Sequence, residues 1–318
     1  MHPALSVIFF TVASGSGYGL LFLLGLLLTI DPQSVSGNEA IAAVALGGAL
    51  AAAGSLSSML HLGQPRRAWR AFSQWRSSWL SREGVAASLS FAPMLAVVWL
   101  EWRGDDAVLL RACGLLLAAG AALTVVCTAK IYATLKTIPA WHNAYVLPGY
   151  LLLGLLGGAA WAWALHAAYA PRVDVLPIAI AGLALASAWF KYAYWRHIDA
   201  KAPAATTESA TGLGRFGSVR SVEAPHTEQN YLTREMGFAL ARKHARRLRG
   251  IGLMLIGVVP PLLAALACLA PAFGLPCAAA AVMSVAGGLF VERWLFFAEA
   301  RHVVMLYYAA KTGTTQHA

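Results

Sequence analysis

The hydrophobic residues of this chain fall into eight long runs, separated by short polar connections and one long connection. A helix that crosses a bilayer needs about 20 mostly apolar residues, and each run is of that order. The runs are continuously apolar and do not alternate residue by residue, which excludes a membrane β-barrel. Backbone groups within hydrocarbon must bond inside their own segment, so the pattern predicts an all-α, polytopic bundle of eight transmembrane helices. The predicted spans cover residues 5–30, 40–60, 84–102, 107–129, 144–168, 173–195, 251–270 and 275–298 of a single membrane domain, residues 1–318.

Composition excludes the soluble classes of protein. Hydrophobic residues make up 59% of the sequence and charged residues 12%, whereas an average soluble domain is about half apolar and a quarter charged. The net charge is +10. The basic residues flank apolar runs and do not line a groove on a soluble fold, so they indicate a membrane surface and not nucleic acid. No Lys or Arg precedes the first run, which is also too long for the apolar core of a signal peptide, so we predict a retained helix.

The distribution of Lys and Arg between the connections predicts the orientation of the bundle, because cytoplasmic connections carry the excess of positive residues. The connections 61–83, 130–143 and 191–250 contain 5, 2 and 11 basic residues, and the segment from Arg293 onward adds 3. The opposite connections contain only 3, against 21 on the first side. Both termini are therefore predicted to lie in the cytoplasm.

The connection 196–250 is much longer than the others and changes character along its length. Residues 201–217 are rich in Ala, Thr, Ser and Gly, whereas residues 231–249 are strongly basic. In the basic segment, apolar side chains fall on one helical face: Leu232, Met236, Leu240 and Leu248. Two compatible interpretations remain open, an interfacial helix held by anionic lipid and a docking site for a cytoplasmic partner.

Ionisable and aromatic side chains converge at the cytoplasmic end of the predicted spans. His61 ends the second span, Glu83 opens the third, and Trp141 precedes the fifth. Glu292 and Arg293 lie close to the same end of the eighth span. Ionisable residues within a membrane span are costly and usually functional. A quinone needs an apolar slot, a hydrogen-bond donor at its carbonyl oxygen and a titrating group with a route to water, and this end of the bundle offers these groups.

Each of these residues has a candidate role and a structural alternative. His61 could bond a quinone oxygen and transfer its proton, since imidazole titrates near neutral pH, or it could cap a helix. Glu83 could relay that proton to the cytoplasm, or it could be a carboxylate favoured by the helix dipole. Arg67 would favour negative charge in the site. Glu292 and Arg293 are further candidates for the proton relay, and alternatively they neutralise one another or extend to the interface.

The first span contains an unusual density of small residues, from Thr11 to Gly19, around a single hydroxyl-bearing ring, Tyr18. Small residues allow helices to approach closely, and packing is the first interpretation of this segment. The alternative is that the segment lines an apolar ligand slot, in which case Tyr18 belongs to the quinone site. A phosphate-binding loop is excluded, because no strand precedes the segment and it lies at membrane depth.

Metal cofactors are not expected in this protein. Haem held by two histidines needs a facing pair inside the spans, and the nine histidines provide no pair at a common depth. The four cysteines are widely separated and include no Cys-x-x-Cys pair, so neither an iron–sulfur cluster nor a zinc site is predicted.

Short segments along the sequence show a resemblance to a known family. The most specific is Ser58–Ala68, in which Ser-Met-Leu-His-Leu-Gly is followed by Gln and Pro. The others are Met1–Thr11, Ser14–Gly19, Leu80–Glu83, Ile138–Trp141, Pro148–Gly149, Thr227–Gly237 and Glu292–Phe297. Together they resemble the membrane anchor subunit family of dimethyl sulfoxide reductase-type molybdoenzymes, over essentially the whole sequence.

The resemblance implies an eight-helix, quinone-reactive anchor without haem, in the inner membrane of a bacterium. Such an anchor exchanges electrons between a menaquinone or ubiquinone pool and a partner subunit with iron–sulfur clusters. The catalytic partner subunit holds a molybdenum bis-pterin cofactor. The family's quinol-site His and Glu correspond to His61 and Glu83.

The predicted orientation departs from part of this family. Enterobacterial members have periplasmic termini and catalytic subunits, whereas the charge distribution here places the His61 face in the cytoplasm. This orientation and the long connection 196–250 resemble the branch that anchors sulfite dehydrogenases, whose catalytic subunits are cytoplasmic. Electron flow could therefore run in either direction.

The sequence thus predicts a non-catalytic anchor subunit of an oxidoreductase, without catalytic residues of its own. Its quinone site is predicted to include His61, Glu83, Arg67, Tyr18 and Trp141. Two alternatives remain. A secondary transporter would show inverted repeats and spans broken near the midplane, and no repeat between the halves is apparent. A purely structural tether would leave the polar groups at one depth unexplained.

Overall fold

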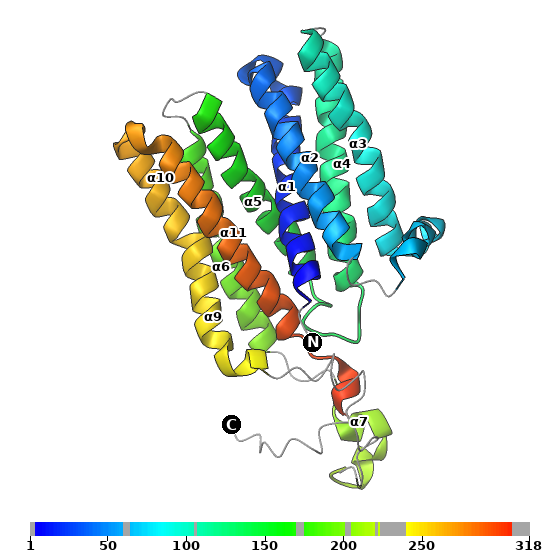
Figure 1. Ribbon diagram of the computed structural model, residues 1–318. Coiled ribbons are helices and arrows are strands. Elements are labelled where there is room, and N and C mark those ends of the chain that lie inside the picture. The colour runs from blue at the N-terminus through cyan, green and yellow to red at the C-terminus, as the bar shows by residue number, and fades with distance from the viewer. Residues whose placement is uncertain are drawn as a thin grey trace.

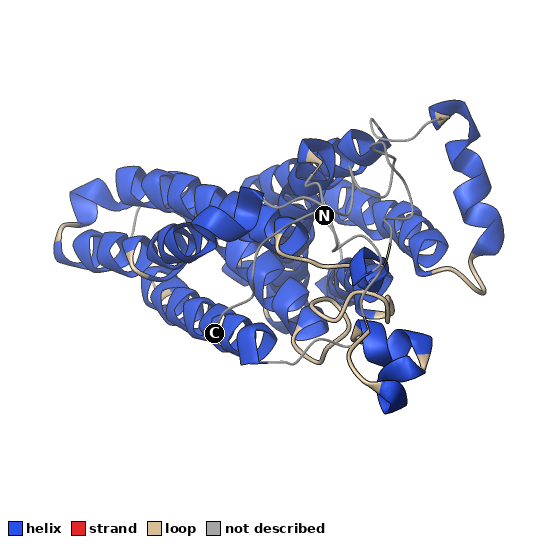
Figure 2. Ribbon diagram, turned by 90° about the horizontal axis from the view of Figure 1, so that it is seen from below, coloured by secondary structure: helices blue, strands red, loops and turns tan. Residues whose placement is uncertain are grey.

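The computed structural model describes residues 4–59, 64–104, 107–169, 175–200, 205–219, 222 and 240–306. All regular structure within them is helical, as the end-on view in Figure 2 shows. In this described part of the protein, eight helical segments are long and apolar enough to cross a membrane. The predicted all-α, polytopic bundle is confirmed.

The spanning helices follow the predicted apolar runs, apart from residues at their ends (Figure 1). They are α1 (Leu5–Ile30), α2 (Gly37–Met59), α3 (Trp79–Arg103), α4 (Ala107–Ala133), α5 (Val146–Tyr169), α6 (Leu176–Ala200), α9 (Leu240–Gly257) continued by α10 (Val259–Leu269), and α11 (Gly274–Ala298). The shorter elements are η1 (Pro32–Ser34), η2 (Pro65–Gln74), α7 (Thr207–Thr211), η3 (Leu213–Phe216) and η4 (Pro271–Phe273).

The helices form two half-bundles that meet along α1. Helices α1 to α4 make the first half-bundle, and α5, α6, α9, α10 and α11 make the second (Figure 1). Helix α1 packs against α2 and α4 on one side and against α5 and α11 on the other. A larger fraction of α1 is buried than of any other span. Helix α1 therefore positions the two halves relative to one another.

The contact between α1 and α5 is made by backbone, because glycines face each other where the helices cross. A Cβ atom added at Gly19 would lie 2.0 Å from the carbonyl oxygen of Gly154, and one added at Gly158 would lie 2.1 Å from the carbonyl carbon of Gly19. Only glycine allows such an approach, which is the packing typical of small residues in membrane helices. The small residues of the first span therefore serve the packing role expected of them.

The seventh span is interrupted at Val258, between α9 and α10. Pro260 and Pro261 follow at once, and proline both lacks a backbone N–H and clashes with the preceding turn. Helix α9 begins at Leu240, so the last part of the basic amphipathic segment continues directly into the span. The rest of that segment, residues 231–239, lies outside the described residues, and both interpretations of it stay predictions.

The structure revises part of the charge distribution. Lys191 and Arg293, counted above with the flanking segments, are buried within α6 and α11. Among the residues that the structure describes, the remaining excess of Lys and Arg lies at the end of the bundle that holds η2 and the start of α9, which is the lower end in Figure 1. The predicted asymmetry of charge keeps its sign.

The backbone contact between α1 and α5 makes a direct prediction. In Gly158→Ala, a methyl group would overlap the backbone of α1 and force the helices apart, and such overpacking costs about 1–3 kcal/mol. We expect a lower temperature of thermal unfolding in detergent. Gly182→Ala on α6 is the matched control, because nothing lies within 4 Å of a Cβ at Gly182. Equal stability of the two variants would contradict the close packing.

Candidate functional site

Glu83 is a buried carboxylate near the basic end of α3. Its exposed fraction is 7%, and it accepts a hydrogen bond from the Thr128 hydroxyl of α4. Helix α3 begins at Trp79, so Glu83 lies beyond the first turn, where the helix dipole acts most strongly. The partner on a neighbouring helix, and not the dipole, is the interaction that the structure provides for this carboxylate.

Tyr18 of α1 lies beside Glu83. The Tyr18 ring is buried, and its hydroxyl faces the side chains of Ser90 on α3 and Thr124 on α4. The Glu83 carboxylate acts on the Tyr18 hydroxyl electrostatically. Helices α1, α3 and α4 therefore bring these two predicted site residues together.

A small cavity with a mixed apolar and polar lining lies next to Thr128, between the two half-bundles. Its volume is about 20 Å³, and we call it the inner cavity. Polar side chains from four helices line it: Thr11, Ser14, Ser16 and Tyr18 of α1, Thr128 of α4, Tyr150 of α5 and Arg293 of α11. This volume holds about one water molecule and is far below the 300–1,000 Å³ of typical ligand pockets. The inner cavity fits water and not a quinone ring.

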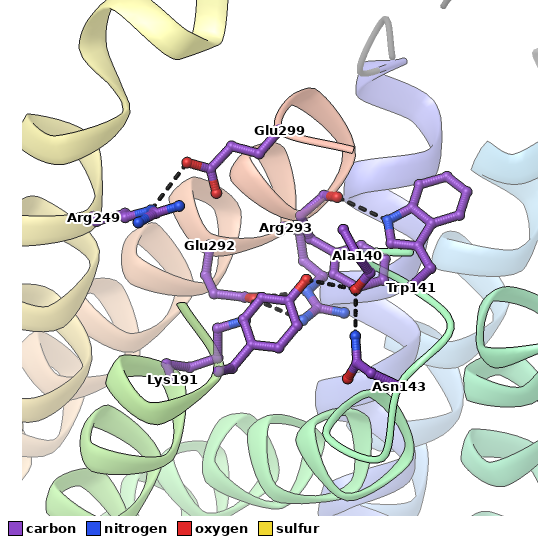
Figure 3. Close-up of polar contacts among 10 residues, drawn as sticks. Ala140, Trp141, Asn143, Lys191, Arg249, Glu292, Arg293 and Glu299 are labelled. Atoms are coloured by element: carbon purple, nitrogen blue, oxygen red, sulfur yellow. Dashed lines mark hydrogen bonds and ion pairs between the residues drawn. The ribbon is translucent and has the colours of Figure 1, made fainter. Parts of the chain in front are cut away.

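A second group of charges is buried in the other half-bundle, where Glu292 and Arg293 of α11 meet Lys191 of α6 (Figure 3). The Glu292 side chain has no exposed surface. Its carboxylate accepts hydrogen bonds from Arg293 Nε and from Arg293 Nη2, the latter at 2.8 Å, and lies 2.5 Å from Lys191 Nζ. Of the two alternatives for Glu292 and Arg293, mutual neutralisation is therefore correct, and neither side chain extends to the interface.

Aromatic rings surround the two cations of this group. The Arg293 guanidinium lies 4.3 Å from the centre of the Tyr150 ring and 4.6 Å from that of Phe296. Lys191 Nζ lies 3.8 Å from the centre of the Tyr194 ring. Cation–π contacts of this kind are strongest where water is excluded, so they compensate part of the cost of burial.

The α4–α5 connection is attached to the same group. Tyr194 Oη and Asn143 Nδ2 both donate to the carbonyl oxygen of Ala140, at 3.0 and 2.7 Å (Figure 3). Trp141 is buried, and its indole Nε1 donates to the carbonyl oxygen of Phe296 at 2.9 Å. Trp141 therefore anchors the connection on α11, and its place in the quinone site stays a prediction.

A third set of charges lies at the rim of the second half-bundle, where α6 and α11 end and the first part of α9 passes. Arg249 Nε donates to Glu299 Oε1 at 3.0 Å, and the Arg249 guanidinium binds both carboxylate oxygens of Asp199 at 2.5 and 3.0 Å. Burial raises the pKa of the Glu299 carboxyl group, and Arg249 opposes this effect. Asp199 is largely exposed, so this set connects the buried charges with solvent.

The structure thus divides the predicted residues between two groups: Tyr18 and Glu83 in the first half-bundle, and Trp141, Glu292 and Arg293 at α11 in the second. Arg67 is exposed on η2. His61 lies outside the described residues, between the end of α2 at Met59 and Gln64.

Sequence reasoning missed Lys191, Thr128 and Tyr150. Lys191 falls inside the predicted span 173–195 but was counted only among the basic residues of the connection, although the spacing of Tyr194 and Trp195 on the same face could have indicated a helix interior. Thr128 and Tyr150 are single polar residues in apolar runs and carry no comparable signal.

Fold and site define a class: a multi-pass helical membrane protein with buried ionisable groups at its basic end. The chain matches the family model of the DMSO reductase anchor subunit (DmsC) over residues 1–298. The chain belongs to this family.

Relatives of known identity support the assignment. The C subunit of the sulfite dehydrogenase of Allochromatium vinosum is 34% identical over 97% of this sequence and 99% of its own length. The C component of the anaerobic dimethyl sulfoxide reductase of Escherichia coli is 27% identical over 41% of this sequence and 49% of its own length. The YnfH component of an anaerobic dimethyl sulfoxide reductase of the same organism is 30% identical over 40% of this sequence and 45% of its own length. No solved structure matches the protein.

The buried charge group predicts an asymmetry between two substitutions. Glu292→Gln leaves two buried cations without a counter-charge, and loss of one member of a buried ion pair costs about 3–5 kcal/mol. Lys191→Met leaves the pair of Glu292 with Arg293 intact, so we expect a smaller loss of stability. Thermal unfolding in detergent checks the order. An equal or larger loss in Lys191→Met would disprove the arrangement.

Proposed function

We propose that this protein is the membrane anchor and quinone-reactive subunit of a three-subunit molybdenum oxidoreductase. In this role it exchanges electrons between the quinone pool and an iron–sulfur partner subunit, which passes them to or from a molybdopterin catalytic subunit. Membership of the anchor subunit family supports the anchoring role. The nearly full-length match to a sulfite dehydrogenase component favours a catalytic subunit that oxidises sulfite.

The observation that carries quinone reactivity is the burial of Glu83 close to the start of α3. Helix α2 ends at Met59, and η2 begins at Pro65. Element η2 packs on α3, where the Phe72 ring lies 3.5 Å from a Cβ built at Gly84, the residue after Glu83. Element η2 therefore lies against the part of α3 that carries the carboxylate. The inner cavity is too small for the ring, so we place the quinone on the His61 side of Glu83.

The chemistry of these residues fits a quinone headgroup among apolar helices. A bound quinol supplies two electrons and two protons, and a quinone takes them up. His61 would donate a hydrogen bond to a quinone oxygen and exchange a proton there, since imidazole can do both near neutral pH. Glu83 would accept or deliver that proton, and Thr128 would orient its carboxylate. The Tyr18 hydroxyl would supply a further polar group next to Glu83.

The basic end of the bundle supports docking of the partner subunits on the cytoplasmic side. Element η2 exposes several arginines together with two tryptophans and a phenylalanine at its surface: Arg66, Arg67, Arg70, Trp69, Phe72 and, just after it, Trp75. Aromatic and arginine side chains are enriched where proteins bind one another. In this proposal the bundle lies in the inner membrane of a bacterium with both termini in the cytoplasm.

The alternatives explain less of the structure. A transporter would use broken spans to bind its substrate, but Pro260 and Pro261 already account for the interruption found in the described residues, at Val258. A structural tether does not require Glu83 to be buried. Its burial is costly and would serve no purpose there.

Substitutions at the quinone site test the proposed function. We expect His61→Ala and Glu83→Gln to leave the assembled complex intact and to lower quinone-coupled turnover at least tenfold, since a positioned acid or base contributes about 10²–10⁴-fold. Turnover with an artificial electron donor or acceptor that bypasses the quinone should persist. Glu101→Gln, the same change at the opposite end of α3, is the control. If His61→Ala retains full turnover with a natural quinone, the assignment of the site is wrong.

Reporter fusions test the orientation. A fluorescent protein that folds only in the cytoplasm should be bright when it is fused after Ala318. Alkaline phosphatase, which needs the oxidising periplasm for its disulfides, should be inactive at the same position. The reverse result would place the basic end and the catalytic subunits in the periplasm.

A further inference from the structure

Glu83 and the buried group around Glu292 are not independent, because polar side chains and a cavity connect them. Thr128, which donates to Glu83, lines the inner cavity, and Tyr150 and Arg293 line it from the opposite half-bundle. Hydroxyl groups and a space that fits one water molecule thus connect the two half-bundles near Glu83.

A second, smaller cavity continues in the same direction. Its volume is about 10 Å³, which is at the lower limit for one water molecule, and we call it the lateral cavity. Tyr150 and Arg293 line both cavities, and Lys191 and Tyr194 line only the lateral one. The Tyr150 side chain therefore stands between the space next to Thr128 and the space next to Lys191.

The Tyr150 hydroxyl is an unsatisfied polar group. Its residue is 6% exposed, and within the part of the protein that the structure describes its oxygen faces the Arg293 guanidinium but makes no hydrogen bond of full geometry. A buried hydroxyl without a partner costs about 1–3 kcal/mol, and groups of this kind are normally satisfied by ordered water. A hydroxyl group adjoining two water-sized cavities therefore points to water as the missing ligand.

Charge counting identifies Lys191 as the member of its group that can release a proton. The three groups carry a net charge of +1 when Lys191 is protonated and zero when it is neutral. Arg293 cannot lose its proton, because a guanidinium does not deprotonate in proteins. The Glu292 carboxylate would stay neutralised by Arg293 after Lys191 had released its proton. Burial disfavours the protonated form of Lys191, whereas the ion pair with Glu292 favours it, so both the charged and the neutral state of Lys191 are accessible.

The rim provides the exit to solvent. Lys191 and Glu299 interact electrostatically, and Trp195 lies between the cations, with its ring centre 5.2 Å from Lys191 Nζ and 5.5 Å from the Arg249 guanidinium. Glu299 Oε2 is buried and has no partner among the described residues, so it is free to accept a proton. The Glu299 side chain is itself 9% exposed at this rim, so a proton taken up there can leave to solvent directly.

We infer that a hydrated proton path crosses from one half-bundle to the other, from Glu83 through Thr128, Tyr150 and Lys191 to Glu299 at the rim. The inference rests on the proposed quinone chemistry at Glu83 and adds the route by which its protons reach bulk water. It gives the second half-bundle, which contains no predicted quinone ligand apart from Trp141, a function of its own.

Each step of the path transfers one proton and no electron. Protonated Glu83 releases a proton through the Thr128 hydroxyl, which takes one proton and gives one, to water in the inner cavity. The Tyr150 hydroxyl exchanges a proton in the same way with water in the lateral cavity. Neutral Lys191 accepts the proton as an ammonium group and then releases it towards the Glu299 carboxylate. The sequence reverses when the quinone is reduced.

Three substitutions in the assembled complex test the path. Tyr150→Phe removes the bridging hydroxyl, Lys191→Met removes the carrier, and Lys191→Arg keeps the cation but cannot release its proton. We expect each to slow, at least tenfold, the exchange of the Glu83 carboxyl proton for deuterium, followed by the infrared carboxyl band that Glu83→Gln abolishes. Tyr132→Phe is the matched control, because Tyr132 stacks on Tyr150 but lines neither cavity.

The conservative substitution separates a proton carrier from a structural ion pair. If Lys191 only neutralises Glu292, the Glu83 carboxyl proton will exchange at the wild-type rate in Lys191→Arg, and the path is disproved. Exchange at the wild-type rate in Tyr150→Phe also disproves it. An experimental structure of the complex should show water density within hydrogen-bond distance of Tyr150 Oη, and an empty inner cavity at a resolution that shows ordered water would overturn the inference.

The outcome for the path is distinguishable from that for the proposed function. Loss of quinone-coupled turnover in His61→Ala, together with unchanged deuterium exchange in Tyr150→Phe, would support the quinone site and reject the path. Full turnover in His61→Ala would reject the quinone site, whereas the deuterium exchange and the water density are measured without a quinone and decide on the path separately.

Discussion

The arrangement of the second half-bundle depends on the cost of placing a carboxylate inside a membrane protein. Glu292 is fully buried, and two cations from two helices compensate its charge. This requirement fixes the rotation of α6 and α11 about their axes, because both helices must point their charged residue at the same place. Aromatic rings pack on Arg293, and Trp141 is attached to α11 beside the same charges.

The first half-bundle handles its buried charge differently. Glu83 has a hydroxyl as its neighbour on α4, and among the residues that the structure describes no cation forms an ion pair with it. A carboxylate without a fixed counter-charge can change its protonation state at lower cost than one that two cations hold. The two halves thus combine a variable charge at Glu83 with a fixed one at Glu292.

Much of this arrangement could be predicted from the sequence, and the rest depends on contacts between helices. Runs of apolar residues determine the eight spans, and isolated ionisable residues at span ends identified Glu83, Glu292 and Arg293. Lys191 was missed because its role depends on Glu292, 101 positions away, and no periodicity within α6 expresses that pairing. Tyr150 and the cavities depend on side-chain packing among four helices, which single-sequence patterns do not encode.

The backbone contact between Gly19 and Gly158 has a consequence for the kind of machine this protein can be. Because no side chain separates α1 from α5 at this point, neither helix can roll or slide there without a clash of backbone atoms. This contact therefore offers no side-chain-filled seam along which the halves could rock between inward-facing and outward-facing forms. A close contact of this kind would suit a subunit that holds a carrier at a constant distance from a docked redox centre, because electron tunnelling requires that distance to stay constant.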